Sequence, residues 1–254
     1  MKCTSEIPVA TRLFRLAKGK NTLVLNETYR SWLTQMGLLS FEQLMFGDIG
    51  RVIEKDHKSD IRRIEGYGKT AYLKRRLTSP IRKSLEMYFL DRCAHTVPFT
   101  EYLHVCSLKR FQFPVMNSIA AGEQRKLGFP CFGFILVDEV RGSRLDEVFN
   151  LADMQDNKVQ LLQSFGKLLA KLHQHGFYAA LSLKDIIVTN INEASLVMID
   201  REARHPHPCH PSKIKARRSL DRSFHRIRRN LPAFDEDHIN IVMQSYRSYL
   251  KYSN

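Results

Sequence analysis

The stretch that decides the fold is Leu161-Leu-Gln-Ser-Phe-Gly-Lys-Leu-Leu-Ala-Lys-Leu-His-Gln-His-Gly-Phe-Tyr178. Its large apolar residues recur at steps of three and four, the spacing that places side chains on one face of a helix. These residues are Leu161, Leu162, Phe165, Leu168, Leu169 and Leu172. Gly176 follows them and predicts the end of the helix, because glycine commonly terminates helices.

A loop and a hairpin are predicted directly after this helix. Residues 179–188 form a loop that runs into a short apolar strand, and a turn follows at residues 190–193. A second apolar strand at residues 196–199 ends on Asp200. Helix, loop, hairpin and a carboxylate at the strand end follow one another in the order that is typical of a kinase active site.

The chain before this stretch is predicted to be rich in strands. A hairpin is expected at residues 62–65 and 70–75 around a turn at 66–69, and two further strands at residues 116–122 and 131–140. Residues 84–110 have a helical pattern that is interrupted near Pro98. Ser40 and Gln43 resemble a capping box and predict a short helix that ends near Met45.

Residues 141–143 mark a break, after which the chain is predicted to be mainly helical apart from the hairpin. A strand-rich half followed by a helix-rich half predicts an α+β fold of two lobes with a cleft between them. The expected divisions are an N-terminal extension at residues 1–47, a strand-rich lobe at 48–140 and a helical lobe at 141–254. Residues 1–47 show no clean period, so no strand is predicted there.

Composition limits the classes of protein to which the chain can belong. With 43% hydrophobic and 26% charged residues, it has the balance of an ordinary globular protein. We expect neither a membrane span nor a secretory signal. The five cysteines are odd in number and scattered, which favours reduced thiols in the cytoplasm. The formal net charge of +14 favours an anionic partner, such as phosphorylated lipid, an acidic membrane surface or nucleic acid.

Several residues have the type and position that nucleotide chemistry requires. Lys74 lies in a predicted strand after a glycine-containing turn, where a lysine can bind nucleotide phosphates; an exposed edge lysine is the alternative. Glu101 lies 27 residues later in a helical stretch and could orient Lys74, or could be an ordinary solvated glutamate. Glu139 and Val140 end an apolar strand and fit a hinge whose backbone binds an adenine edge. Asp200 could hold Mg²⁺ or could simply form a turn.

The chain resembles the bacterial lipopolysaccharide kinase family, the Kdo and heptose kinases of the lipopolysaccharide core, which have a protein-kinase-like fold. The resemblance extends over about residues 30–250. It is carried by short motifs at residues 37–45, 70–75, 134–140, 172–178, 197–204, 219–227 and 243–246. The resemblance implies a kinase that uses ATP and Mg²⁺. It also implies that Lys74 binds phosphate, that Glu101 pairs with Lys74, and that Asp200 holds the metal.

The chain departs from the kinase pattern in its catalytic loop. Kinases have His-Arg-Asp-Leu, three residues, and then a metal-binding Asn or His. When residues 178–185 are set against this pattern, the catalytic Asp position falls on Ala180 and the metal-ligand position falls on Asp185. Ala180 cannot orient a substrate hydroxyl, a role that contributes about 10²- to 10⁴-fold in rate. Asp185 is therefore the candidate for both catalysis and metal binding. No glycine-rich phosphate loop is evident, and residues 46–50 are a poor substitute.

Two further segments could bind ligands. Residues 205–210 concentrate His and Cys, but the prolines among them and the lack of a second ligand cluster favour a surface loop over a zinc site. The run from Lys213 to Arg229 holds eight Lys or Arg residues and one acid, Asp221. It could be a solvated helix face, or it could contact acidic lipid head groups or core phosphates. With Phe224 as its only aromatic residue, it lacks the stacking platform of a single-strand nucleic-acid binder.

Three functions remain open from the sequence. The first is an ATP-dependent kinase of a lipopolysaccharide core sugar, peripheral at the cytoplasmic face of the inner membrane, with the core or another anionic glycolipid as its partner. The second is a pseudokinase of the same family that binds nucleotide or acts as a scaffold. The third is a basic nucleic-acid-binding protein. Retention of a paired Lys74 and Glu101 would speak against the third.

Overall fold

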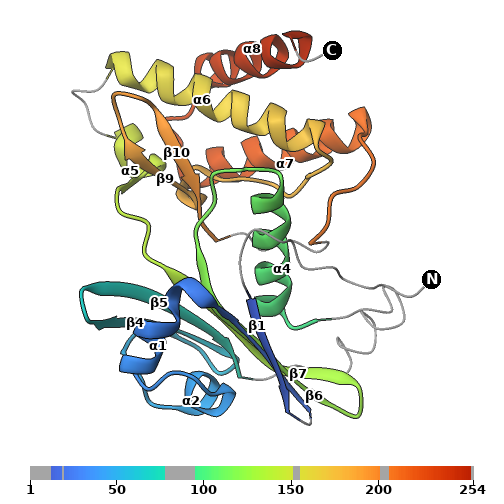
Figure 1. Cartoon of the computed structure of the whole chain (residues 1–254). Coiled ribbons are helices and arrows are strands. Elements are labelled where there is room, and N and C mark those ends of the chain that lie inside the picture. Colours follow the sequence, from blue (N-terminus) through green and yellow to red (C-terminus); the bar gives the residue numbers. More distant parts are fainter. Residues whose placement is uncertain (1–12, 19, 78–94, 151–154, 201–205, 253–254) are drawn as a thin grey trace. The chain divides into compact units, whose positions relative to one another are not determined.

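A computed structural model of the chain describes residues 13–18, 20–77, 95–150, 155–200 and 206–252 (Figure 1). The chain divides into two compact units. Unit 1 combines Met1–Arg110 with Met116–Glu139, and unit 2 combines Phe111–Val115 with Val140–Asn254. The strands of unit 1 and the helices of unit 2 confirm the predicted α+β class. Among the described helices, none has both the length and the apolarity that a bilayer-spanning segment requires.

Unit 1 is built on a seven-stranded antiparallel sheet with the strand order β1-β2-β6-β7-β5-β4-β3. The strands are β1 (Leu13–Lys18), β2 (Asn21–Asn26), β3 (Arg51–Lys55), β4 (Ser59–Gly66), β5 (Lys69–Arg76), β6 (Ser118–Lys126) and β7 (Phe129–Asp138). The predicted hairpin at residues 62–75 is confirmed as β4 and β5. Its two-residue turn places Tyr67 and Gly68 at positive φ, the backbone that tight hairpins require.

The helices of unit 1 are η1 (Glu27–Tyr29), α1 (Arg30–Gln35), α2 (Phe41–Phe46) and α4 (Val97–Arg110). The predicted short helix is confirmed as α2, and Ser40 caps it by accepting the Gln43 N–H at 3.1 Å. Side chains of α1 and α2, including Trp32 and Leu44, form one core with Leu73 and Phe134 of the sheet. The part of the predicted helix at residues 84–110 that precedes residue 95 lies outside the described residues.

Strands β1 and β2 were not predicted, because residues 1–47 show no alternation of polar and apolar side chains. In β2, Leu23, Val24 and Leu25 are all buried in succession. A strand that is covered on both faces loses the period-two signal that identifies half-buried strands. β2 pairs with β6, so the sheet extends into the segment that the sequence analysis treated as an extension.

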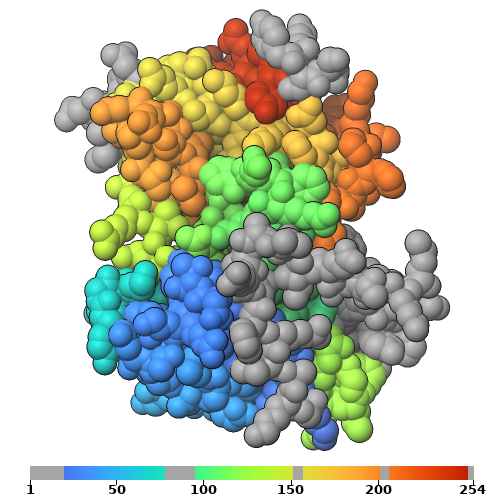
Figure 2. All heavy atoms as spheres, viewed as in Figure 1, coloured from blue at the N-terminus to red at the C-terminus, as the bar shows by residue number. Residues whose placement is uncertain are grey.

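Unit 2 contains β8 (Ser143–Arg144), α5 (Leu145–Asn150), α6 (Gln155–Gln174), η2 (Leu183–Asp185), β9 (Ile186–Asn190), β10 (Ser195–Met198), α7 (Lys213–Asn230) and α8 (Glu236–Tyr252). The predicted helix is confirmed as α6, which ends two residues before Gly176 (φ +80°). The predicted hairpin is confirmed as β9 and β10, and β8 adds a short third strand to it. β10 contacts α6, and the two adjoin on the surface (Figure 2, orange and yellow).

Helices α6 and α8 pack closely because Gly166 lies at their contact. A Cβ atom at this position would clash with the backbone carbonyl of Val242 in α8. Further along the pair, Nδ1 of His173 lies 3.0 Å from the hydroxyl of Tyr246, which links the two helices by a buried hydrogen bond. This packing holds the C-terminal end of α6, from which the following loop departs.

Candidate functional site

Within unit 1, β5 and α4 bring together Lys74, which was predicted to bind phosphate, and Glu101, which was predicted to orient Lys74. Leu73 faces the core formed with α1 and α2, so Lys74 points to the opposite face of the sheet. There its Nζ atom lies 3.0 Å from Oε1 of Glu101 in α4. Glu101 is only 1% exposed, and a carboxylate in such a place requires a charged or hydrogen-bonding partner. This is the arrangement that the kinase resemblance implies; the phosphate-binding role itself remains a prediction.

The predicted hinge lies at the end of β7, and the boundary between the two units falls between Glu139 and Val140. The N–H of Glu139 donates to the carbonyl of Thr70 at 3.1 Å, so that donor is used within unit 1. The carboxylate of Glu139 accepts the Tyr72 hydroxyl at 3.1 Å. An adenine edge at this hinge would therefore have to use backbone groups other than the Glu139 N–H.

The turn between β3 and β4 has an internal anion. Asp56 accepts the backbone N–H groups of Lys58 and Ser59 at 2.6 and 2.5 Å. These hydrogen bonds hold the pKa of Asp56 below its usual range. Successive backbone N–H groups in a turn can bind an anion such as phosphate. In this turn the chain's own Asp56 carboxylate accepts them.

In unit 2, the loop after α6 positions Asp185 through its own backbone. Asp185 ends the short helix η2, and its Oδ2 atom accepts the Ser182 N–H at 3.0 Å. One residue before Ser182, the N–H of Leu181 donates to Oγ of Ser223 in α7 at 3.0 Å. Ser223 is fully buried and in turn donates to the Ser219 carbonyl at 2.8 Å. The loop is thus held to α7 at Leu181 and closed on itself between Ser182 and Asp185.

The hairpin register brings Asp200 close to Asp185. Met198 pairs with Ile186, and the next N–H, that of Ile199, donates to the carbonyl of Asp185 at 2.8 Å. Asp200 then follows with φ +51°, in the left-handed region. Asp tolerates this backbone better than most residues, and such positions concentrate at functional sites. The two carboxylates that were predicted to hold metal therefore lie on one pocket.

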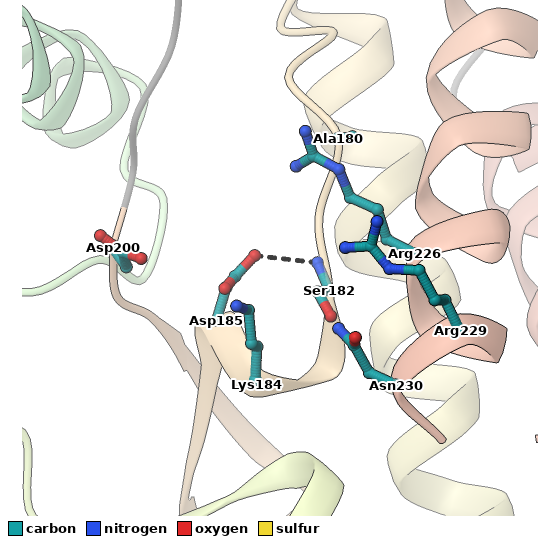
Figure 3. A pocket seen from close by; sticks show the side chains of 8 residues that line it. All are labelled: Ala180, Ser182, Lys184, Asp185, Asp200, Arg226, Arg229 and Asn230. Atoms are coloured by element: carbon teal, nitrogen blue, oxygen red, sulfur yellow. Dashed lines mark hydrogen bonds between the residues drawn. The ribbon is translucent and has the colours of Figure 1, made fainter. Parts of the chain in front are cut away.

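This pocket has a volume of ≈ 290 Å³, and all the described residues that line it belong to unit 2 (Figure 3). Its lining residues are Ala180, Ser182, Lys184, Asp185, Asp200, Arg226, Arg229 and Asn230. Asp200 faces Asp185 across the space, and the two arginine side chains extend from α7 toward the loop (Figure 3). Ala180 presents only a methyl group to the pocket, so among the described lining residues the carboxylates are those of Asp185 and Asp200.

Two carboxylates fit a hard divalent cation that is shared with a nucleotide. Mg²⁺ is commonly bound by one or two carboxylates together with substrate phosphates, and does not need a complete protein cage. Among the residues that the structure describes, no group of three His, Cys, Asp or Glu side chains could hold a metal ion. For residues 205–210, His205 lies outside the described residues, and the zinc alternative stays untested.

Sequence reasoning missed the individual roles of Arg226, Arg229 and Asn230. It identified the basic run from Lys213 to Arg229 but could not say which of its residues reach a site. In α7 all eight Lys and Arg residues of the run are exposed, while Ser219, Leu220, Ser223 and Ile227 are buried. Ser223, Arg226 and Asn230 follow one another at three- and four-residue steps, and this spacing could have placed them on one helix face.

Comparison with known proteins finds similarity in structure and not in sequence. No family model matches the chain, and no curated protein matches it in sequence. Among solved structures, the chain is similar to WaaP in a complex with acyl carrier protein, with 16% sequence identity and a TM-score of 0.53. The similarity covers 91% of this chain and 99% of that chain. At this identity the match shows the fold alone: the chain has a kinase-like fold of the kind that WaaP has.

Proposed function

We propose that the chain is an ATP-dependent phosphotransferase that acts on a sugar of the lipopolysaccharide core. The observation that carries the proposal is the pairing of Asp185 and Asp200 on one pocket beside the loop of Ala180. The Lys74–Glu101 pair supplies the second requirement, a held cation for nucleotide phosphate. The kinase-like fold shared with WaaP and the sequence resemblance to lipopolysaccharide kinases point to the same class of reaction.

Each protein group has a distinct task in this proposal. Lys74, oriented by Glu101, binds phosphate oxygens of ATP, and Asp185 and Asp200 bind Mg²⁺. The metal, when bound with ATP, offsets the negative charge of the phosphate groups during transfer. With alanine at position 180, the acceptor hydroxyl must be oriented by another group. Asp185 is five residues away on the same pocket and is the candidate for that role.

The partner in this proposal is the lipopolysaccharide core or another anionic glycolipid, met at the surface of the inner membrane. The net charge of +14 supports an acidic surface as the place of action, since basic proteins accumulate at acidic membranes. The Lys74–Glu101 pair counts against the nucleic-acid-binding alternative, because such a protein has no need of a buried glutamate that holds a strand lysine.

A pseudokinase is the second candidate, and two observations favour it. By the kinase resemblance, Ala180 stands at the position of the residue that orients the acceptor. In the β3–β4 turn, the Asp56 carboxylate already accepts the N–H groups of Lys58 and Ser59. A pseudokinase of this kind would bind nucleotide without transferring phosphate.

Radiolabelled phosphate transfer from ATP to purified core lipopolysaccharide tests the proposal. We expect transfer that depends on Mg²⁺ and is abolished by Asp200→Asn, which keeps an Asx side chain at the left-handed position. Nucleotide binding without transfer would support the pseudokinase. If the protein neither binds nucleotide nor transfers phosphate, both candidates are rejected.

A further inference from the structure

Two arginines of the unit 2 pocket have no counter-ion among the residues that the structure describes. Within the part of the chain that the structure describes, neither Arg226 nor Arg229 forms a hydrogen bond or an ion pair. Their neighbours on α7 differ in this respect: Arg228 pairs with Glu236, and Arg222 donates to the Tyr178 carbonyl at 3.2 Å. The pocket therefore presents two guanidinium groups that no described carboxylate neutralises.

The two guanidinium groups are held as a pair by the helix. Arg226 and Arg229 are three residues apart, so their side chains are neighbours on the surface of α7. Both extend over the same space, on the side opposite Asp200 (Figure 3). α7 itself is fixed to the loop of Ala180 through the buried Ser223, which accepts the Leu181 N–H. Arg226 follows this anchor by less than one helical turn, so this part of α7 lies beside the loop.

Guanidinium is the side-chain group that best recognises phosphate and carboxylate. Its planar donors match the oxygens of these anions two at a time, and the bonds are charge-assisted. Two adjacent cations without a partner repel each other, and a bound anion relieves that repulsion. The opposite wall of the pocket carries Asp185 and Asp200. These carboxylates would hold a metal ion, and they would repel an anion that has no metal ion bound to it. The anion-binding wall and the metal-binding wall are thus separate parts of one pocket.

We infer that Arg226 and Arg229 form an acceptor subsite for a sugar that already carries a phosphate or a carboxylate. The acceptor's anionic group binds to the two arginines, and this places the rest of the sugar over Ala180 and Asp185. The inference rests on the proposed function and adds to it the class of acceptor, an anionic sugar rather than a neutral one. From the sequence, the basic run from Lys213 to Arg229 could bind either acidic lipid or core phosphates. The pocket assigns two residues of this run, Arg226 and Arg229, to the sugar.

Binding of monosaccharides, followed by ligand-observed NMR at low salt without nucleotide, tests this subsite. The probes are heptose 7-phosphate, Kdo, neutral heptose and inorganic phosphate. We expect the parent protein to bind both anionic sugars about tenfold more tightly than neutral heptose, in keeping with the strength of charge-assisted hydrogen bonds. The variant Arg226→Gln/Arg229→Gln should lose this preference. The variant Arg226→Lys/Arg229→Lys, which keeps the charge but not the planar fork, should keep part of it.

Lys215→Gln/Arg218→Gln is the matched control. These two residues lie on the same helix at the same three-residue spacing, are exposed, and do not line the pocket. The control removes the same net charge, so it should keep the preference for anionic sugars if the subsite is local. Circular dichroism of every variant verifies that α7 still folds; the substituted side chains are exposed, so no loss of fold is expected.

Several results would overturn the inference. One is an unchanged preference for anionic sugars in Arg226→Gln/Arg229→Gln, and another is an equal loss in the control. Loss of the thermal shift by Mg-ATP in the arginine variant, with sugar binding intact, would assign the arginines to nucleotide. Inorganic phosphate that binds as tightly as heptose 7-phosphate would contradict recognition of a sugar. If the anionic preference depends on the arginines but the parent transfers no phosphate, the subsite stands and the kinase proposal fails.

Discussion

Nζ of Lys74 in β5 lies 3.0 Å from Oε1 of Glu101 in α4, and the glutamate is almost completely buried. The two residues are 27 positions apart and belong to different kinds of secondary structure, so their meeting is a property of the tertiary fold. A buried glutamate whose partner is removed keeps the cost of its own desolvation. The pair can therefore be tested through stability as well as through nucleotide binding.

Lys74→Met should lower the free energy of unfolding by about 1–3 kcal/mol, because it removes the Lys74 cation that contacts the buried Glu101 carboxylate. Lys74→Met/Glu101→Gln should recover most of that loss, since no buried charge remains unpaired. Urea denaturation of the parent, the two single variants and the double variant measures the coupling. Additive effects of the two substitutions would show that the contact does not stabilise the fold.

Mg-ATP should raise the melting temperature of the parent protein, as a ligand that binds only the native state does. Lys74→Met should remove this rise, and so should Asp200→Asn. Arg51→Gln, an exposed strand residue away from Lys74, serves as a control in the same sheet and should leave the rise intact. A parent protein that shows no shift at millimolar Mg-ATP would contradict the assignment of a nucleotide site.

Asp60 forms a second buried ionic group in unit 1 that was not predicted. It is 2% exposed and accepts hydrogen bonds from Arg62 and Arg75, with Nε–carboxylate distances of 2.9 and 2.6 Å. Burial acts to raise the pKa of Asp60, but the two guanidinium groups outweigh it and hold that pKa below its usual range. Both arginines are themselves buried and share the Asp60 carboxylate, while Arg62 also pairs with the exposed Asp48.

Asp60→Asn should therefore destabilise the protein by about 3–5 kcal/mol, the cost of leaving buried charges uncompensated. Since the folded pKa is lowered, the stability that Asp60 contributes is present at neutral pH. It is lost only as the pH falls below about 3.9, the pKa in the unfolded chain. Asp48→Asn removes the exposed partner of Arg62 and should change stability little, which makes it the matched control. Similar denaturation midpoints for the two variants would contradict the special role of Asp60.

Burial lowers the pKa of His173 in α6 to about 4, so the imidazole that contacts Tyr246 is neutral in the folded protein. In the unfolded chain the pKa is about 6.5. The contribution of neutral His173 to the free energy of unfolding is therefore fully present above pH 6.5. It declines as the pH falls toward 4, because His173 binds a proton in the unfolded chain but not in the folded protein. The loss over this range is about 3 kcal/mol. His173→Gln should show a flatter pH dependence of unfolding, and an unchanged slope would contradict the assignment.

The elements with a clear period could be predicted from the sequence, and the site could be predicted only in part. The helix at α6 and the hairpin at β9–β10 follow from the apolar spacing around Leu161–Tyr178 and the strand that ends on Asp200. β2 could not be predicted because both of its faces are buried, which removes the alternation. Lys74 and Glu101 could be proposed as a pair only through the general order of parts in a kinase, since the sequence around either residue does not indicate its partner.

The arginines of the pocket show a different limit. The sequence displays eight basic residues from Lys213 to Arg229, and charge alone does not distinguish those that meet a ligand from those that face solvent. The distinction depends on which face of α7 is anchored by Ser223, and that contact joins residues 42 positions apart. Asp60 was missed for a similar reason, because a polar residue at an inward strand position is recognisable only once its two arginines are placed.

The last prediction concerns Ala180 and Asp185. If the chain is a kinase that lacks only the group that orients the acceptor hydroxyl, Ala180→Asp should increase phosphate transfer to core lipopolysaccharide by up to about 10²- to 10⁴-fold. If Asp185 already orients the hydroxyl, Ala180→Asp should change little and Asp185→Asn should abolish transfer. Asparagine is the informative substitution at position 185, because its side-chain oxygen can still accept the Ser182 N–H that shapes the loop. Asp185→Ala removes both the charge and this cap, so a greater loss of stability in that variant measures the structural role separately. We expect the second outcome, because Asp185 and Asp200 line the same pocket as Ala180. In addition, the loop from Ala180 to Asp185 is held to α7 by the hydrogen bond from the Leu181 N–H to Ser223. Transfer by none of the proteins, with nucleotide binding intact, would leave the pseudokinase as the remaining function, because a site that lacked a single group would have responded to its return.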